Sequence, residues 1–218
     1  MNSREAIKGL YREEIDGIRA FAVLAVIINH INNDVLPNGF LGVDIFFVIS
    51  GYVITSSLTR RTSKNFLDFI VGFYERRIKR ILPALILYVL IIGFLICTLN
   101  PKPGHTLWTG LFSLFGISNY RLLKWSDNYF ALNTQFNVFL QTWSLAVEEQ
   151  FYVIFPFIIW FSGYGQKRVK GARNFFILIF ILSFFSLVYF IYLYQINQSA
   201  AYFLMPTRFW EIGAGVLI

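Results

Sequence analysis

One stretch near the N-terminus combines a cation and a histidine at a spacing that suits acid–base chemistry. It reads IDGIRAFAVLAVIINH and runs from Ile15 to His30. In a helix that turns about 100° per residue, Arg19 and His30 return to nearly one face, about 16 Å apart along the axis. Histidine exchanges protons near neutral pH, so His30 is the candidate general base for an attacking hydroxyl. Asp16 lies near the same stripe and could neutralise Arg19, although both could equally mark the cytoplasmic end of a helix that His30 caps.

A second set consists of carboxylates in an apolar setting. The stretch LQTWSLAVEEQFYVIFP, from Leu140 to Pro156, places Glu148 and Glu149 among aromatic residues. An ionisable group near the centre of a membrane helix costs about 2.5 to 3.5 kcal/mol, so such groups usually face a bundle interior and serve a function. We therefore expect one of the two carboxylates to face a polar cavity. The alternative is a span that begins later, which would leave both at the outer interface.

A third set is a cluster of arginines in FYERRIKRILP, from Phe73 to Pro83. On a helix, Arg76 and Arg80 lie one turn apart on one face, and Arg77 lies beside them. The guanidinium fork suits phosphate oxygens, so the cluster predicts a site for a phosphate-bearing ligand at the cytoplasmic surface. An ordinary positive cluster on lipid headgroups is equally consistent with these residues.

The fourth set lies in GFLGVDIFFVISGYVI, from Gly39 to Ile54. Its small residues allow helices to approach closely, and Asp44 places an acid a few residues into the membrane. The triplet Ser50-Gly51-Tyr52 could break the helix and expose backbone groups to a substrate, or it could only pack helices. A nucleophilic role for Ser50 is disfavoured, because no base is near it in the sequence.

The elements that must position these residues are membrane helices. Of the 218 residues, 56% are hydrophobic and 14% are charged, a composition that excludes a soluble domain and predicts an all-α, polytopic helix bundle. Five apolar blocks approach the length of about 20 residues that crosses a bilayer. They cover residues 15–36, 40–58, 81–99, 139–161 and 175–194. A partial sixth covers 204–218, where Arg208 and Glu211 are spaced to pair with each other.

The distribution of positive charge predicts the orientation. Cations concentrate in residues 60–80 and 163–174, which are therefore expected to be cytoplasmic, as is the N-terminus. This orientation accounts for the formal charge of +7 better than a nucleic-acid partner does. Two cytoplasmic segments need an even number of crossings between them, which two apolar blocks already supply. The short apolar segment 107–120 is thus expected to enter the membrane and return, and a surface-lying helix is the alternative.

Taken in order, these sets resemble the membrane acyltransferase-3 family, whose members O-acylate polysaccharides, lipopolysaccharide, peptidoglycan and small metabolites. The resemblance covers nearly the whole chain. It rests on DGIRAFAVLAVIINH, GVDIFFVISGYVI, YERRIKRILPA, WSLAVEEQFYVIFP and TRFWEIGAG. Family members are longer, so the resemblance implies that residues 1–218 are the N-terminal part of the domain. Val138 and Gln141 stand where the most similar branch often carries a proline and a histidine.

The resemblance also implies an activity and the residues that perform it. An acyl group, usually acetyl, would pass from cytoplasmic acyl-CoA to a hydroxyl of a cell-surface carbohydrate or lipid-linked glycan, in the inner membrane and without a metal. His30 would act as base or acyl relay, Arg19 as a pantetheine or thioester contact, and Glu148 as the family acid. The CoA phosphates would be held by Arg76, Arg77 and Arg80. Substrate or structural roles would fall to Asp16, Asp44, Ser50, Gly51, Glu149, Arg208 and Glu211.

Direct transfer and an acyl-histidine relay are both compatible with these residues. Two other interpretations stay open. A transporter or channel would also explain buried charges, but it favours repeated halves or paired broken helices, which the sequence does not show. The third interpretation is a truncated, inactive fragment whose helices insert without closing a catalytic cavity.

Overall fold

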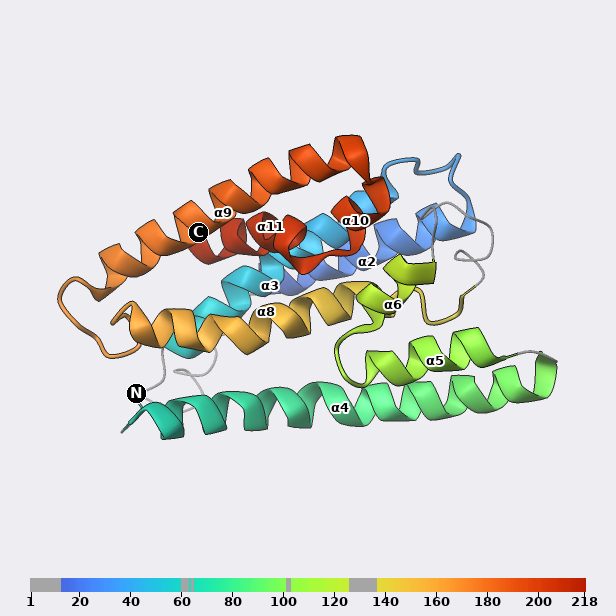
Figure 1. Cartoon of the computed structure of the whole chain (residues 1–218), viewed down its shortest axis with the longest axis horizontal. Coiled ribbons are helices and arrows are strands. Elements are labelled where there is room, and N and C mark those ends of the chain that lie inside the picture. Colours follow the sequence, from blue (N-terminus) through green and yellow to red (C-terminus); the bar gives the residue numbers. More distant parts are fainter. Residues whose placement is uncertain (1–12, 60–62, 64, 101–102, 126–136) are drawn as a thin grey trace.

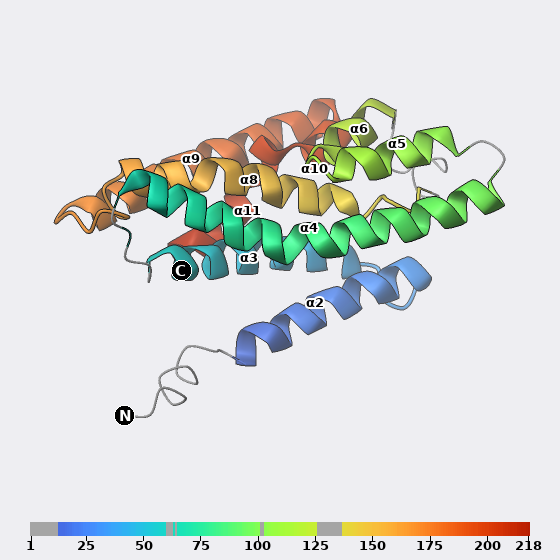
Figure 2. The same ribbon diagram turned by 90° about the horizontal axis from the view of Figure 1, so that it is seen from below.

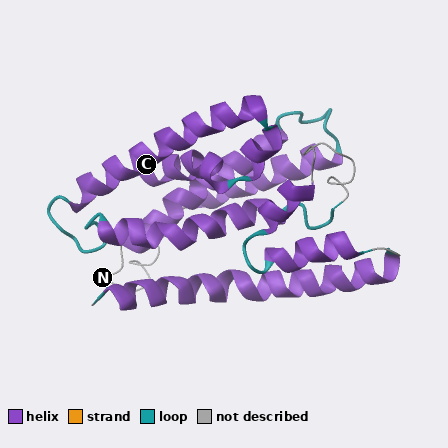
Figure 3. Cartoon of the chain, in the orientation of Figure 1, coloured by secondary structure: helices purple, strands orange, loops and turns teal. Residues whose placement is uncertain are grey.

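The computed structural model of the chain describes residues 13–59, 63, 65–100, 103–125 and 137–218. All regular elements in these residues are helical, which confirms the all-α prediction (Figure 3). In chain order they are α2 (Glu13–Ile31), η1 (Gly39–Leu41), α3 (Gly42–Thr59), α4 (Phe66–Leu99), α5 (Gly104–Ser113), α6 (Ser118–Trp125), α8 (Thr142–Phe161), α9 (Gly171–Ile196), α10 (Gln198–Phe203) and α11 (Met205–Leu217).

Four described helical segments are long and apolar enough to cross a bilayer, so the chain is a multi-pass membrane protein. They are residues 39–58, 66–99, 142–161 and 171–196. Helix α2 is not among them, since its first half carries Glu14, Asp16 and Arg19. Helix α4 has 34 residues, and the predicted block 81–99 is only its C-terminal part. At 1.5 Å per residue α4 is about 51 Å long, well beyond the hydrocarbon thickness of about 30 Å.

The core lies where α3, α8, α9 and α11 meet, and large aromatic side chains fill it. Phe151 stacks on Phe155 with ring centroids 4.7 Å apart. Helix α11 lies between α3 and α9 (Figure 1). A Cβ atom at Gly51 would collide with the carbonyl oxygen of Ile212, so glycine is needed where these two backbones touch. Helix α3 continues without a break through Gly51, so of the two alternatives for this triplet the structure supports helix packing.

Helix α2 packs mainly on η1 and α3 and lies at the edge of the bundle, away from the other helices (Figure 2). The contact is close because Gly39 and Gly42 lie directly against the backbone carbonyl groups of Ala25 and Ala22. Large apolar side chains on the other faces of α2 are exposed, as expected for a helix in lipid. Only one face of α2 is therefore fixed by the described part of the chain.

The segment 107–120 forms parts of two short helices, α5 and α6, separated by a turn in which Gly116 has φ of +66°. Helix α5 lies along the C-terminal half of α4 (Figure 1). With 10 and 8 residues, neither α5 nor α6 can cross a bilayer alone. Asn119 of α6 is fully buried and donates from Nδ2 to the carbonyl oxygen of Phe203 at 2.9 Å. Entry of this segment into the membrane stays a prediction.

Candidate active site

A buried polar cluster lies midway along α3 and α8. The Ser50 hydroxyl donates to Glu148 Oε1 at 2.6 Å, and the Tyr152 hydroxyl donates to Glu148 Oε2 at 3.0 Å. Ser50 and Tyr152 are both buried, so these bonds are shielded from competing solvent. Glu148 lies in the seventh position of the 20-residue helix α8. It is therefore inside the bundle and not at the end of a later span.

The two adjacent carboxylates have different surroundings. Glu148 faces the polar cluster, whereas Glu149 lies against the turn between α5 and α6. A Cβ atom at Gly116 would come within 2.6 Å of Glu149 Oε2. The next residue, Gln150, donates from Nε2 to the Gly116 carbonyl oxygen and to Asn119 Oδ1, both at 2.8 Å. Of the carboxylate pair, Glu148 is thus the candidate for chemistry, and Glu149 lies beside a structural network.

Arg77 faces the same cluster from α4. Its Cζ atom lies 4.3 Å from the centroid of the Tyr152 ring. Arg77 also interacts electrostatically with the Glu148 carboxylate. Arg76 and Arg80, in contrast, are exposed. The three arginines predicted to form one phosphate site therefore divide into two exposed side chains and one that turns inward.

Arg19 brings a second cation to the cluster, from α2. Its guanidinium lies 3.9 Å from Asp16, as the spacing suggested, and 5.8 Å from the centroid of the Phe46 ring. It also interacts electrostatically with Glu148. Its Nε atom is buried and has no hydrogen-bond partner among the described residues. Because an unsatisfied buried donor costs about 1–3 kcal/mol, this N–H group is a candidate contact for a substrate oxygen.

His30 lies at the C-terminal end of α2 and is exposed. Its Nδ1 atom is 2.8 Å from the carbonyl oxygen of Val26. A carbonyl oxygen only accepts, so Nδ1 carries the proton, and in the neutral ring Nε2 keeps its lone pair. His30 and Arg19 share a stripe of α2, but eleven residues separate them by about 16 Å. The candidate base therefore lies about three helical turns beyond Arg19 along α2.

An open groove lies between α4 and the start of α8. Its volume is about 400 Å³, and apolar side chains form most of its wall. Arg80 lines it, together with Tyr88, Gln141 and Thr142. Gln141, one of the two positions that depart from the related branch, donates from Nε2 to the Tyr88 hydroxyl. Arg80 therefore faces a surface that is accessible from outside the bundle.

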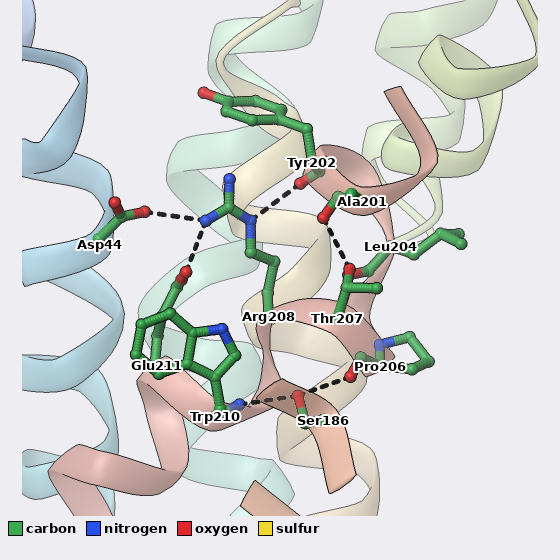
Figure 4. Close-up of polar contacts among 10 residues, drawn as sticks. All are labelled: Asp44, Ser186, Ala201, Tyr202, Leu204, Pro206, Thr207, Arg208, Trp210 and Glu211. Atoms are coloured by element: carbon green, nitrogen blue, oxygen red, sulfur yellow. Dashed lines mark hydrogen bonds and ion pairs between the residues drawn. The ribbon is translucent and has the colours of Figure 1, made fainter. Parts of the chain in front are cut away.

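Arg208 forms a separate buried ionic cluster (Figure 4). It lies 2.5 Å from Glu211 Oε1 and 3.1 Å from Asp44 Oδ1, and its Nε donates to the Tyr202 carbonyl oxygen at 3.1 Å. The predicted pairing of Arg208 with Glu211 is confirmed. Asp44 is a further partner, 164 residues away, that spacing alone does not reveal. The cluster joins α11 to α3 and α10, which indicates a structural role.

The chain matches a family model described as an acyltransferase domain over residues 12–218. It is 36% identical over 215 residues to O-acetyltransferase OatA of Staphylococcus aureus strain NCTC 8325 / PS 47, covering 95% of this chain and 34% of OatA. A protein of Staphylococcus aureus strain MSSA476, provisionally named an O-acetyltransferase, is 37% identical over 214 residues, with the same two coverages.

The chain spans about a third of the length of these curated relatives (34%). No solved structure matches it. The family match covers almost the whole chain, including every helix that contributes to the Glu148 cluster and to the Arg208 cluster. On this evidence the chain belongs to the acyltransferase domain family.

Proposed function

We propose that the chain carries the membrane-embedded site of an O-acyltransferase that moves an acetyl group from acyl-CoA to a hydroxyl of a cell-surface carbohydrate. The observation that carries this proposal is the carboxylate of Glu148, held inside the bundle by two hydroxyl groups and within electrostatic range of Arg19 and Arg77. Ionisable groups in such a place usually serve a function. The names of the relatives, which include O-acetyltransferase OatA, support the acetyl group.

The donor would approach from the side on which α4 begins, which the charge distribution predicts to be cytoplasmic. The exposed guanidinium groups of Arg76 and Arg80 suit the phosphates of CoA, which would have to reach about 21 Å along α4 from Phe66 to contact Arg80. The buried Nε–H of Arg19 suits the carbonyl oxygen of the pantetheine arm or of the thioester. If it contacts the thioester carbonyl, the Arg19 Nε–H group would stabilise the negative charge that develops on that oxygen during attack.

His30 would deprotonate the acceptor at Nε2. The acceptor oxygen then forms the new ester bond with the acyl carbon, and the CoA thiolate leaves. Because about 16 Å separates Arg19 from His30, the acyl group must be carried over that distance. The pantetheine arm would carry the thioester over that distance, and direct transfer would then occur at His30. In the relay alternative, Nε2 attacks the thioester at His30 and the CoA thiolate leaves. The acceptor hydroxyl then attacks the acyl-histidine, and the leaving imidazole takes its proton.

Replacing His30 with alanine is expected to lower acetyl transfer by at least about 100-fold, since general-base catalysis contributes about 10² to 10⁴. Membranes that contain the chain would be supplied with radiolabelled acetyl-CoA and cell-envelope glycans, and label in alkali-labile ester would be counted. His105→Ala is the matched control, because His105 is the other histidine and is exposed on α5.

The control variant should transfer label at the wild-type rate. Wild-type rates in both variants would remove His30 from the mechanism. If the inserted wild-type chain binds acetyl-CoA but transfers nothing, the proposed transfer activity fails for these 218 residues. If it does not bind acetyl-CoA either, the donor assignment fails as well.

A further inference from the structure

The three arginines in the first half of α4 differ in their surroundings. Arg76 and Arg80 are exposed, whereas Arg77 packs its guanidinium over the buried ring of Tyr152 at 4.3 Å. Consecutive helical residues point about 100° apart, so Arg77 can face the buried Tyr152 ring while Arg76 stays exposed and Arg80 lines the open groove. A phosphate ligand bound by all three would require Arg77 to leave this contact.

Tyr152 connects Arg77 to the carboxylate of Glu148. Its hydroxyl donates to Glu148 Oε2 at 3.0 Å, while its ring face carries the Arg77 guanidinium. Tyr152 is 5% exposed, and a cation–π contact is stronger in a desolvated place than at a surface. Ser50 holds the other carboxylate oxygen. The carboxylate therefore has fixed donors on both oxygens, and one of those donors is itself held from α4.

We infer that Arg77 and Tyr152 are positioning residues for Glu148 and that Arg77 does not bind the phosphates of the donor. This inference rests on the proposed function, because it assumes that Glu148 works in acyl transfer. The Tyr152 hydroxyl fixes the direction of the carboxylate, and the Arg77 guanidinium fixes the ring. The α4–α8 pair thus separates two tasks, with Arg76 and Arg80 facing outward toward the donor and Arg77 facing inward toward the site.

Steady-state kinetics with acetyl-CoA as the varied substrate separates the two roles. Tyr152→Phe keeps the ring and removes the donor, so we expect kcat to fall about tenfold, the loss of one bond to a charged group, with KM unchanged. Arg77→Met should also lower kcat at constant KM, whereas Arg80→Met should raise KM. Arg77→Lys, which keeps the charge over the ring, should recover part of the lost kcat.

The matched control is Tyr74→Phe. Tyr74 also links α4 to α8, since its hydroxyl donates to the Val153 carbonyl oxygen at 2.8 Å, but it does not contact Glu148. Its loss should leave both kinetic constants unchanged. If Tyr74→Phe lowers kcat as Tyr152→Phe does, the effect comes from general α4–α8 packing and the inference is wrong. It is also wrong if Arg77→Met raises KM as Arg80→Met does.

A second measurement does not depend on activity. The guanidinium resonances of arginine-labelled protein in nanodiscs would be recorded, because the Tyr152 ring current must shift the signal of a guanidinium 4.3 Å away. We expect the Arg77 signal to be shifted in the wild type and in Tyr152→Phe, and to lose that shift in Tyr152→Leu. An unshifted Arg77 signal in the wild type overturns the inference. If the shift is present but the wild type transfers no acetyl group, the proposed function fails while the contact stands.

Discussion

Replacing Glu148 with glutamine is expected to lower acetyl transfer by about two to three orders of magnitude, the range seen when preorganised electrostatic groups are removed from an active site. Glutamine has nearly the same shape and can still accept from Ser50. It cannot accept at its amide nitrogen, so the Tyr152 hydroxyl loses its acceptor. The substitution also removes the negative charge near Arg19 and Arg77. Neither guanidinium group then has the Glu148 charge to balance its own.

Initial rates of label transfer in membranes with equal amounts of inserted protein would measure this effect. Glu149→Gln is the matched control, since it makes the same chemical change one residue away, beside Gly116 and outside the cluster. Its rate should stay near that of the wild type. A Glu148→Gln variant that transfers at the wild-type rate would show that the buried carboxylate is structural. A large loss in Glu149→Gln alone would show that Glu149, and not Glu148, serves in the chemistry.

The sequence predicts the helical fold because composition and block length leave few alternatives for a chain this apolar. It is less informative about where α4 begins. Hydropathy divides a chain at its charged residues, so the basic stretch before Ile81 is assigned to a surface segment. The structure instead continues one helix from Phe66, because Phe66 and Phe69 pack on Trp160 and Tyr74 bonds to the Val153 carbonyl. Contacts with α8, not hydropathy, determine the helical form of this stretch.

Part of the active-site cluster can be read from the sequence and part cannot. Glu148 and Tyr152 are four residues apart, so their contact on one helical face is predictable. Ser50 and Glu148 are 98 residues apart, and only the packing of α3 on α8 brings them to 2.6 Å. No base is near Ser50 along the chain, but the fold brings the Glu148 carboxylate to it. The inward turn of Arg77 is likewise decided by the position of α8 and by no property of the arginine cluster itself.

The Arg208 cluster differs from the candidate active site in how fully its arginine is engaged. Both clusters combine carboxylates with arginine away from the chain surface, half-buried around Glu148 and buried at Arg208 and Glu211. Near Glu148, however, Arg19 keeps an Nε–H group that has no hydrogen-bond partner among the described residues. Arg208 instead donates to two carboxylates and a backbone carbonyl, and its Cζ lies 4.7 Å from the centroid of the Tyr202 ring. A guanidinium so fully engaged has little capacity left for a substrate, so its expected contribution is to stability.

Replacing Arg208 with methionine is therefore expected to destabilise the fold by about 3–5 kcal/mol, the cost of breaking a buried ion pair by removing one partner. Methionine fills a similar volume, but it leaves Asp44 and Glu211 close together without a cation. Glu211 is 1% exposed, and its Oε2 atom already has no hydrogen-bond partner among the described residues. Unfolding of the purified protein by SDS, followed by circular dichroism, measures the change in the free energy of unfolding.

A neutral version of the whole cluster provides the control. Arg208→Met combined with Asp44→Asn and Glu211→Gln removes the uncompensated charge, so much of the lost stability should return, as it does when buried ion pairs are replaced together. Equal destabilisation in the single and triple variants would show that the shape of Arg208, and not its charge, joins α11 to α3. A single variant that unfolds like the wild type but transfers no acetyl group would contradict the structural role and place Arg208 in substrate binding.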